Sequence, residues 1–142
     1  MKADRFPRDQ EITLSILEWQ DSWSVGNPDL DTDHKRLINI IQKIGEYSPQ
    51  SADLSQLFSE LEDYTKYHFV KEEQLMEAAN LPDLTEHKKS HRDFVEWLHS
   101  VRYTFTVSQQ SRRLLLDSVD EYLQNWLKNH ILKTDMNYKG LI

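Results

Sequence analysis

Apolar residues recur at steps of three and four along most of this chain, which is the period of an amphipathic α-helix. The pattern predicts four helices, over about residues 31–48, 52–78, 83–105 and 108–133, with Asp31 or Thr32 as the cap of the first. Because short loops join them, neighbouring helices should be antiparallel. The predicted fold is therefore all-α, an up-down-up-down antiparallel four-helix bundle with an N-terminal arm.

The periodicity is unclear before the first predicted helix. We expect residues 1–16 to be an N-terminal extension that is partly disordered, and residues 17–142 to form a single bundle domain. Trp19 and Trp23 belong to the arm, and such large aromatic side chains are expected to cover one end of the bundle.

Composition narrows the choice of chemistry. With 3 Gly and 4 Pro among 142 residues, the chain favours long helices, and with no Cys any metal must be held by imidazole and carboxylate groups. A net charge of -7 disfavours binding to nucleic acid or to an anionic membrane. The sequence lacks a secretory signal and any apolar run of membrane-spanning length, so we predict a cytoplasmic protein, and we take a monomer as the default.

Seven side chains able to bind metal fall on the apolar faces of the predicted helices. They are His34, His68, Glu72, His87, His91, His130 and Asp135. Burial of an unpaired polar group costs several kcal/mol, so the seven need a shared partner, and metal ions are the most economical one. The positions therefore predict a buried dinuclear metal site.

The spacing of these residues supports a single site at one end of the bundle. His68 and Glu72 are four residues apart, as are His87 and His91, so each pair shares a helix face. Either motif alone is a weak signal. When the second and third helices fold back on each other, however, the two pairs come into register, and the outer two histidines lie at the same end.

Asp135 does not fit a straight α-helix, because five residues after His130 it lies about 140° away from that stripe. We therefore predict a π-type turn, or the end of the helix, near residues 130–135. The alternative is an ordinary acidic residue near a helix C-terminus, where the helix dipole disfavours it.

The ligand count predicts the chemistry. If both carboxylates and a hydroxide bridge two metal ions, and the five histidines divide three and two, one coordination position stays open. An imidazole-rich set without thiolates suits iron, although manganese, cobalt and zinc also accept these ligand types.

The chain resembles the hemerythrins, in particular the stand-alone bacterial ones, over about residues 17–142. The stretches that carry the resemblance are LEW, SVGNPDLDTDHKRL, HFVKEEQLM, LPDLTEHKKSHRDF and WLKNHILKTDMNYKG, which contain the motifs H, HxxxE, HxxxH and HxxxxD. The resemblance implies two non-haem iron ions, one held by His87, His91 and His130 and the other by His34 and His68. It also implies that Glu72, Asp135 and an oxo or hydroxo group bridge them, and that dioxygen binds reversibly at the iron of His34 and His68.

Two positions depart from the family pattern. Asp33 stands where bacterial members often have Gln, and Asn27 stands where an apolar residue is usual. We expect neither side chain to touch a proposed ligand.

Three apolar residues close to the ligands in sequence, Leu37, Phe69 and Leu127, are predicted to exclude water around bound dioxygen and so to slow autoxidation. Trp126 fits the bundle core at least as well as such a pocket. His99 lies off the stripe of His91 and is interpreted as a non-ligand.

Three functions remain open at this stage. The leading hypothesis is a non-catalytic dioxygen-binding protein, for transport, storage, delivery to an oxygen-consuming enzyme, or sensing through a separate signalling partner. A di-iron oxidase, peroxidase or nitric-oxide reductase is the alternative, but the two carboxylates argue against it, since di-iron carboxylate bundles use four. The third is a structural metal bundle, which requires a coordinatively saturated site.

Overall fold

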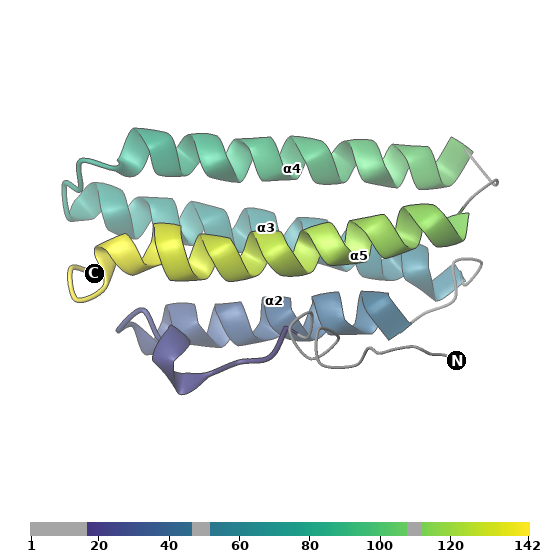
Figure 1. Ribbon diagram of the computed structural model, residues 1–142. Helices are drawn as coiled ribbons and strands as arrows, with labels where there is room; N and C mark the ends of the chain where they lie inside the picture. The colour runs from purple at the N-terminus through teal and green to yellow at the C-terminus, as the bar shows by residue number, and fades with distance from the viewer. Residues whose placement is uncertain (1–16, 47–51, 108–111) are drawn as a thin grey trace.

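Four long helices make up the body of the molecule in a computed structural model that describes residues 17–46, 52–107 and 112–142. They are α2 (Pro28–Glu46), α3 (Ala52–Ala78), α4 (Leu84–Val107) and α5 (Arg112–Asn129). Consecutive helices run in opposite directions (Figure 1), and the described residues contain no strand. The predicted all-α, up-down-up-down bundle is confirmed.

The helices do not all approach each other equally. Backbones come close between α2 and α3, between α3 and α4, and between α2 and α5. Contact between α4 and α5 is made instead through large rings, among them Phe94 and Trp126, whose centroids are 4.1 Å apart. The bundle is therefore filled by aromatic side chains on the α4–α5 side.

The first helix begins earlier than the sequence pattern predicted. Asn27 Oδ1 accepts hydrogen bonds from the amides of Asp29, at 3.0 Å, and Leu30, at 3.2 Å, and Pro28 occupies the first helical position. Asp31 is not the cap, because its carboxylate accepts bonds from Ser24 and from the amide of Val25 in the arm. The prediction of a start at Asp31 or Thr32 was therefore wrong.

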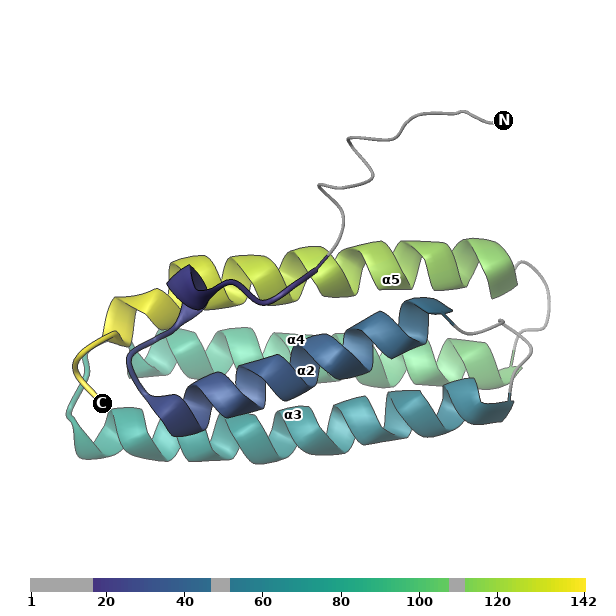
Figure 2. The same cartoon turned by 90° about the horizontal axis from the view of Figure 1, so that it is seen from below.

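The N-terminal arm passes between α5 and α2 before it enters α2 (Figure 2). Leu17 and Trp23 are buried in the main core, the amide of Gln42 donates to the carbonyl of Leu17, and the Lys35 ammonium lies 5.0 Å from the Trp19 ring. The arm thus covers the side of α2 and not only an end of the bundle, because Leu17 reaches Gln42, near the C-terminal end of that helix. The expected disorder concerns residues 1–16, which lie outside the described residues.

Two clusters of buried apolar residues form the core. The main cluster runs through all four helices and includes Leu37, Leu61, Leu98 and Leu123. A smaller one joins the start of α2 to the C-terminal segment through Leu30, Met76 and Tyr138, among others. No helix in the described part of the chain is long and apolar enough to cross a membrane.

Candidate metal centre

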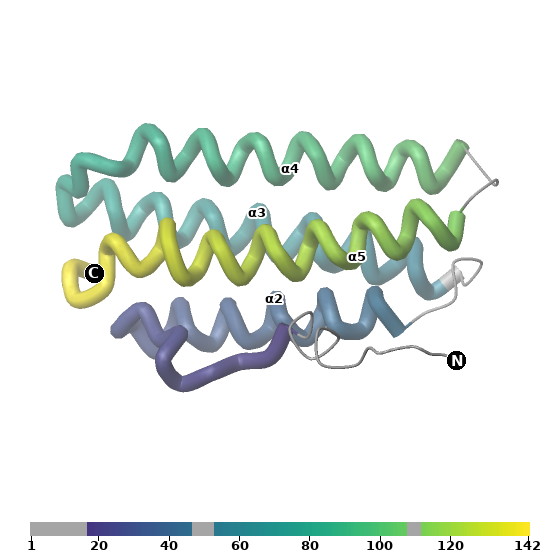
Figure 3. The backbone as a smooth tube through the Cα atoms, viewed as in Figure 1, coloured from purple at the N-terminus to yellow at the C-terminus, as the bar shows by residue number. Residues whose placement is uncertain are grey.

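The seven predicted ligands converge at one end of the bundle, where α2 and α4 begin and α3 and α5 end (Figure 3). None is more than 5% exposed. They come from α2 (His34), α3 (His68, Glu72), α4 (His87, His91) and the two short helices after α5 (His130, Asp135). The register expected from the spacing of the two motifs across the α3–α4 hairpin is therefore present in the structure.

Potential ligand atoms fall into two overlapping groups. One contains His87, His91 and His130 with Glu72 and Asp135, and the other contains His34 and His68 with Glu72. Within each group the nitrogen and oxygen atoms lie within 4.8 Å of one another. The histidines are thus divided three and two, as the ligand count from the sequence suggested.

Glu72 faces both groups with different oxygen atoms. Its Oε1 lies 3.1 Å from His87 Nε2 and 2.9 Å from His91 Nε2. Its Oε2 lies 3.5 Å from His68 Nε2 and 3.8 Å from His34 Nε2. A carboxylate in this position can offer one oxygen to each of two metal ions.

Asp135 divides its oxygens in the same way. Oδ1 lies 3.0 Å from His87 Nε2 and 3.1 Å from His130 Nε2, while Oδ2 lies 3.2 Å from His34 Nε2. The two carboxylates are therefore arranged as a pair of bridges between a three-histidine group and a two-histidine group.

Buried polar atoms without partners test whether this cluster suits metal ions. Both ring nitrogens of His34 and both carboxylate oxygens of Asp135 are buried and make no hydrogen bond. Buried groups of this kind are nearly always satisfied in folded proteins. Imidazole nitrogen and carboxylate oxygen that share one enclosed space form a fitting donor set for first-row metal ions.

The electrostatics of the cluster favour positive charge. Burial opposes protonation of His34, but Asp135 and Glu72 outweigh it and raise its pKa to about 10. The same balance raises the pKa of His87 to about 9. Burial disfavours the charged form of Asp135, yet the neighbouring histidines hold its pKa far below the usual range. Without metal, protonated histidines thus balance the charge of the carboxylates, and bound metal ions would replace those protons.

A local change of helix type brings Asp135 to the cluster. The α-helical part of α5 ends at Asn129, and η2 (His130–Thr134) is a π-helix, followed by the 3₁₀ helix η3 (Asp135–Tyr138). The amide of Asp135 donates to the carbonyls of His130 and Ile131. Because a π-turn brings residues five apart onto one face, this confirms the turn predicted from the spacing.

The expectation that Asp33 touches no proposed ligand was wrong. His68 Nδ1 lies 2.9 Å from Asp33 Oδ2, and the same carboxylate accepts bonds from Tyr64, at 2.7 Å, and Lys71, at 2.8 Å. Burial works against its charge, but these partners hold the pKa of Asp33 far below the usual range. Asp33 precedes His34 in sequence and so points about 100° away from it, towards α3.

Other supporting contacts were also missed by sequence reasoning. His91 Nδ1 lies 2.7 Å from Glu73 Oε2, His130 Nδ1 lies 3.3 Å from Ser90 Oγ, and Tyr138 donates its phenolic proton to Glu72. Partners of this kind fix the orientation and tautomer of a ligating side chain. The second acidic residue directly after Glu72 was a visible signal for one of them.

The apolar residues predicted to line a dry pocket are all buried. Phe69 is stacked on His91, with ring centroids 3.8 Å apart, while Leu37 and Leu127 belong to the main core. Trp126 is both a core residue and a neighbour of the cluster, since its ring is stacked on that of His130 at 4.5 Å. Trp126 therefore packs against the core and also contacts a predicted ligand, so the two roles considered from the sequence do not exclude each other.

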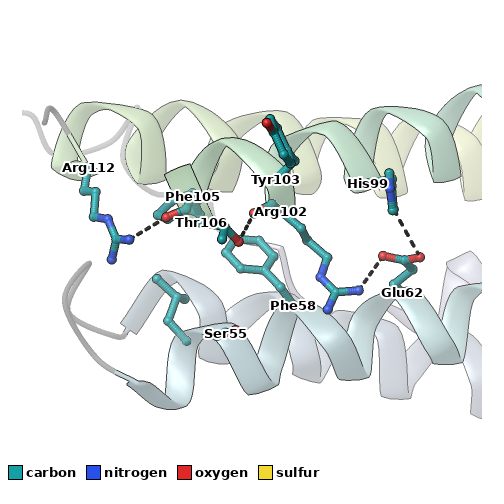
Figure 4. Close-up of a pocket in the computed structure, with 10 residues that line it drawn as sticks. Ser55, Phe58, Glu62, His99, Arg102, Tyr103, Phe105, Thr106 and Arg112 are labelled. Atoms are coloured by element: carbon teal, nitrogen blue, oxygen red, sulfur yellow. Dashed lines mark hydrogen bonds and ion pairs between the residues drawn. The ribbon is translucent and has the colours of Figure 1, made fainter. Parts of the chain in front are cut away.

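A cavity of about 500 Å³ lies at the opposite end of the bundle, between α3 and α4 (Figure 4). Arg102 crosses it to reach Glu62, with 2.6 Å between the guanidinium and the carboxylate, and the exposed His99 lies at its edge. His99 is thus far from the ligand cluster, as its interpretation as a non-ligand requires.

Known proteins provide an independent comparison. Residues 25–142 match the family described as the Hemerythrin HHE cation binding domain. The chain is 32% identical over 127 residues to a bacteriohemerythrin of Stenotrophomonas maltophilia, covering 88% of this chain and 80% of that protein. It is 34% identical over 123 residues to a myohemerythrin of Theromyzon tessulatum, covering 87% and 91%. A crystal structure of wild-type hemerythrin has the same fold, with a TM-score of 0.73, 22% identity, and coverage of 89% of this chain and 97% of that chain.

Proposed function

This chain belongs to the hemerythrin family, and we propose that it binds dioxygen reversibly at a non-haem di-iron centre built from the seven clustered side chains. One observation carries the proposal. Glu72 and Asp135 each turn one oxygen towards the group of three histidines and the other towards His34, which belongs to the group of two histidines. The smaller group would thus offer one protein ligand fewer to the metal ion that it holds, which would leave room there for dioxygen.

The proposed assignment follows the two groups. His87, His91 and His130 would hold one iron ion, His34 and His68 would hold the other, and Glu72 and Asp135 would each offer one oxygen to each ion. Dioxygen would bind on the side of the two-histidine group, which offers fewer protein ligands. When bound, a ferrous pair supplies electrons to dioxygen and recovers them on release.

The chain's own residues then have separate tasks. Asp33 holds the ring of His68 and keeps its proton on Nδ1, so that Nε2 faces the metal. Leu37, Phe69 and Leu127 exclude water from the oxygen-binding side and slow autoxidation to the ferric state. Five imidazoles with only two carboxylates favour reversible binding over oxygen activation, so we propose a carrier, a store, a donor to an oxygen-consuming enzyme, or a sensor acting through a partner, and not an enzyme.

An optical experiment tests the proposal. Protein loaded anaerobically with ferrous iron should contain two irons per chain, develop a visible charge-transfer spectrum in air, and lose it on degassing through repeated cycles. Irreversible bleaching with turnover of a substrate would support the di-iron enzyme instead. If neither dioxygen nor azide altered the spectrum, the centre would be a saturated structural one, and an iron content far from two would refute the assignment.

A further inference from the structure

A lysine and a histidine meet the same oxygen of Asp33 beside the candidate metal centre. Asp33 Oδ2 lies 2.9 Å from His68 Nδ1 and 2.8 Å from Lys71 Nζ. The other oxygen, Oδ1, accepts a hydrogen bond from the phenol of Tyr64 at 2.7 Å. The negative charge that Asp33 turns towards His68 is therefore shared with a cation.

His68 is the side chain through which this charge reaches the centre. It belongs to the group of two histidines, on whose side dioxygen would bind, and its Nε2 lies 3.5 Å from Glu72 Oε2. The other histidine of that group, His34, makes no hydrogen bond through Nδ1 within the described part of the chain. A charge outside the ligand cluster can thus act on this group by a hydrogen bond to His68.

The surroundings make the charge of Asp33 effective. The side chains of Asp33 and His68 are 5% and 2% exposed, so little water screens the interaction between them. The side chain of Lys71 is 20% exposed, and its ammonium lies 5.0 Å from the centroid of the Tyr67 ring and 3.0 Å from the exposed Asp29. These contacts hold the cation of Lys71 in place against a buried carboxylate.

The group of three histidines is arranged differently. His91 Nδ1 lies 2.7 Å from Glu73 Oε2, a contact similar to that of His68 with Asp33. Among the residues that the structure describes, however, no lysine or arginine pairs with Glu73. The described residues thus place a cation behind the carboxylate on the dioxygen side and none behind Glu73.

A carboxylate that accepts the Nδ1 proton of a ligating histidine makes the ring a stronger electron donor, because its negative charge increases the basicity of the imidazole. A stronger donor favours ferric over ferrous iron. Since the iron pair gives up electrons when dioxygen binds, the same change favours the oxygenated form. A cation that partly neutralises the carboxylate opposes each of these effects.

We propose that Lys71 sets the oxygen affinity of the centre by partly neutralising the charge of Asp33. Asp33 strengthens His68 as a donor and so tightens oxygen binding, whereas Lys71 weakens this effect and favours release. Both are positioning residues, because each acts on the iron through His68. The inference rests on the di-iron centre proposed above and adds the residues that regulate its affinity.

Oxygen equilibria of the ferrous protein, followed by the visible spectrum at controlled oxygen pressures, test the proposal. Lys71→Met removes the cation at similar side-chain length, and we expect the dissociation constant for dioxygen to fall about 5-fold or more. Asp33→Asn, measured with ferrous iron in excess, should raise it about 10-fold or more. A merely structural role of both residues would instead weaken binding in both variants, and that result would overturn the proposal.

Other lysine variants provide the controls. Lys71→Arg keeps the charge and should keep most of the wild-type affinity, whereas Lys71→Gln, which lacks the charge but still donates hydrogen bonds, should behave like Lys71→Met. Lys89→Met removes a positive charge from an exposed pair with Asp93, at 2.8 Å, and should leave the affinity unchanged, because water and salt screen that charge. An equal effect of Lys71→Met and Lys89→Met would show an influence of net charge alone and would overturn the proposal.

The reduction potential of the centre supplies a second measurement that does not depend on dioxygen. Anaerobic redox titration should give a lower potential for Lys71→Met than for wild type and a higher one for Asp33→Asn. When Asp33→Asn is already present, Lys71→Met should have much less effect on potential and affinity, since the carboxylate through which Lys71 acts is absent. An undiminished effect in the double variant would overturn the route through Asp33.

Iron content and the reversibility of the oxygen spectrum, measured on the same samples, separate this inference from the proposed function. If wild-type protein held two irons and bound dioxygen reversibly, while Lys71→Met changed neither affinity nor potential, the inference alone would be overturned. Wild-type protein that held no iron, or whose iron did not bind dioxygen reversibly, would overturn the proposed function and the inference with it.

Discussion

At the scale of single residues, the most informative one is Asp33, whose role the sequence did not reveal. Its neighbour His34 was identified from its position on an apolar stripe, whereas Asp33 was noted only as a departure from the family pattern and was expected to touch no proposed ligand. Three side chains on α3, Tyr64, His68 and Lys71, meet its carboxylate. Such a contact depends on how α2 and α3 are placed, which residue spacing within one helix cannot predict.

The role of Asp33 leads to a test of metal affinity. Asp33→Asn keeps the size of the side chain but removes the charge that holds His68, so we expect affinity for ferrous iron to fall by about 10- to 100-fold. Competition with a chelator measures the change. Asp29→Asn is the control, since Asp29 is exposed and also pairs with Lys71, at 3.0 Å, and it should bind iron normally. Equal loss in both variants would contradict a specific role for Asp33.

Leu127 is the residue at which the exclusion of water can be tested. Leu127→Ala should speed autoxidation of the oxygenated protein, measured as decay of its visible spectrum, because the smaller side chain, about one turn before His130, admits water to the buried ligand cluster. Leu123→Ala is the matched control, one turn further from that histidine and equally buried. Both should lose about 2–5 kcal/mol of stability, and only the first should oxidise faster. An unchanged rate in Leu127→Ala would refute the proposed shielding.

Glu62 is a buried carboxylate far from the candidate centre, and it predicts a dependence of stability on pH. Burial favours its neutral form, but Lys66, at 2.9 Å, and Arg102, at 2.6 Å, outweigh this and lower its pKa below the usual 4.5. A pKa lower in the folded than in the unfolded chain stabilises the fold above pH 4.5, and this contribution is lost as the pH falls through the folded value.

We therefore expect Glu62→Gln to lower the free energy of unfolding at neutral pH by about 1–2 kcal/mol. The difference from wild type should shrink below pH 4.5. Glu60→Gln serves as the control, because the pair of Glu60 with Arg36 is exposed and worth little. Urea denaturation at both pH values measures these effects, and a difference that stayed constant with pH would argue against the charge of Glu62.

At the scale of elements, helix type, number and approximate length were predictable because the apolar stripes are long and regular. The ends were less so. Asp31 has the chemistry of a cap, but it binds the arm, and the cap is Asn27. The turn at residues 130–135, in contrast, was predicted correctly. In a straight α-helix, a histidine and an aspartate five residues apart cannot face the same site, so the spacing required a π-turn.

The packing of α2 against α5 predicts an unusual response to a helix-favouring substitution. Alanine is better than glycine inside a helix by about 1 kcal/mol. A Cβ on Gly45 would, however, lie 2.9 Å from Asp120 Oδ2, and this short, partly buried side chain is held by Gln124. We expect Gly45→Ala to destabilise the protein by about 1 kcal/mol, since the close contact must be relieved by a shift.

A double-mutant cycle provides the control for that prediction. With Asp120→Ala already present, the obstacle is gone, and Gly45→Ala should stabilise the protein by about 0.5–1 kcal/mol. Thermal or urea unfolding of the four proteins measures the coupling. Should Gly45→Ala have the same effect in both backgrounds, the close approach of α2 and α5 at this point would not limit stability.

At the scale of the whole molecule, the sequence predicted the bundle and the convergence of seven side chains because both follow from periodicity and from the alternation of helix direction. It did not predict which sides of the bundle carry aromatic rings and which carry networks of charged side chains. The α4–α5 side is packed with aromatic rings, while charged networks around Asp33 and Glu62 lie on helices α2 to α4. These depend on three-dimensional neighbours.

The same convergence makes global stability depend on metal. Two carboxylates and five histidines with little exposure are brought together at the end where all four helices meet, and several of their atoms make no hydrogen bond. Metal ions that bind only the folded chain stabilise it by about 2.7 kcal/mol at a hundred times the dissociation constant. Removal of iron by a chelator should therefore lower the melting temperature, and restoring ferrous iron under nitrogen should recover it.

A histidine inside the ligand cluster and one outside it should also differ in how their substitution affects stability. His99→Ala, at the far end of the bundle, should leave the iron-dependent rise in melting temperature intact, whereas His87→Ala should abolish most of it, because His87 approaches both carboxylates. Calorimetry with and without iron measures the rise. If the metal-free and iron-loaded proteins melted at the same temperature, the seven side chains would not bind metal in the folded state, and the partnerless atoms of His34 and Asp135 would need another explanation.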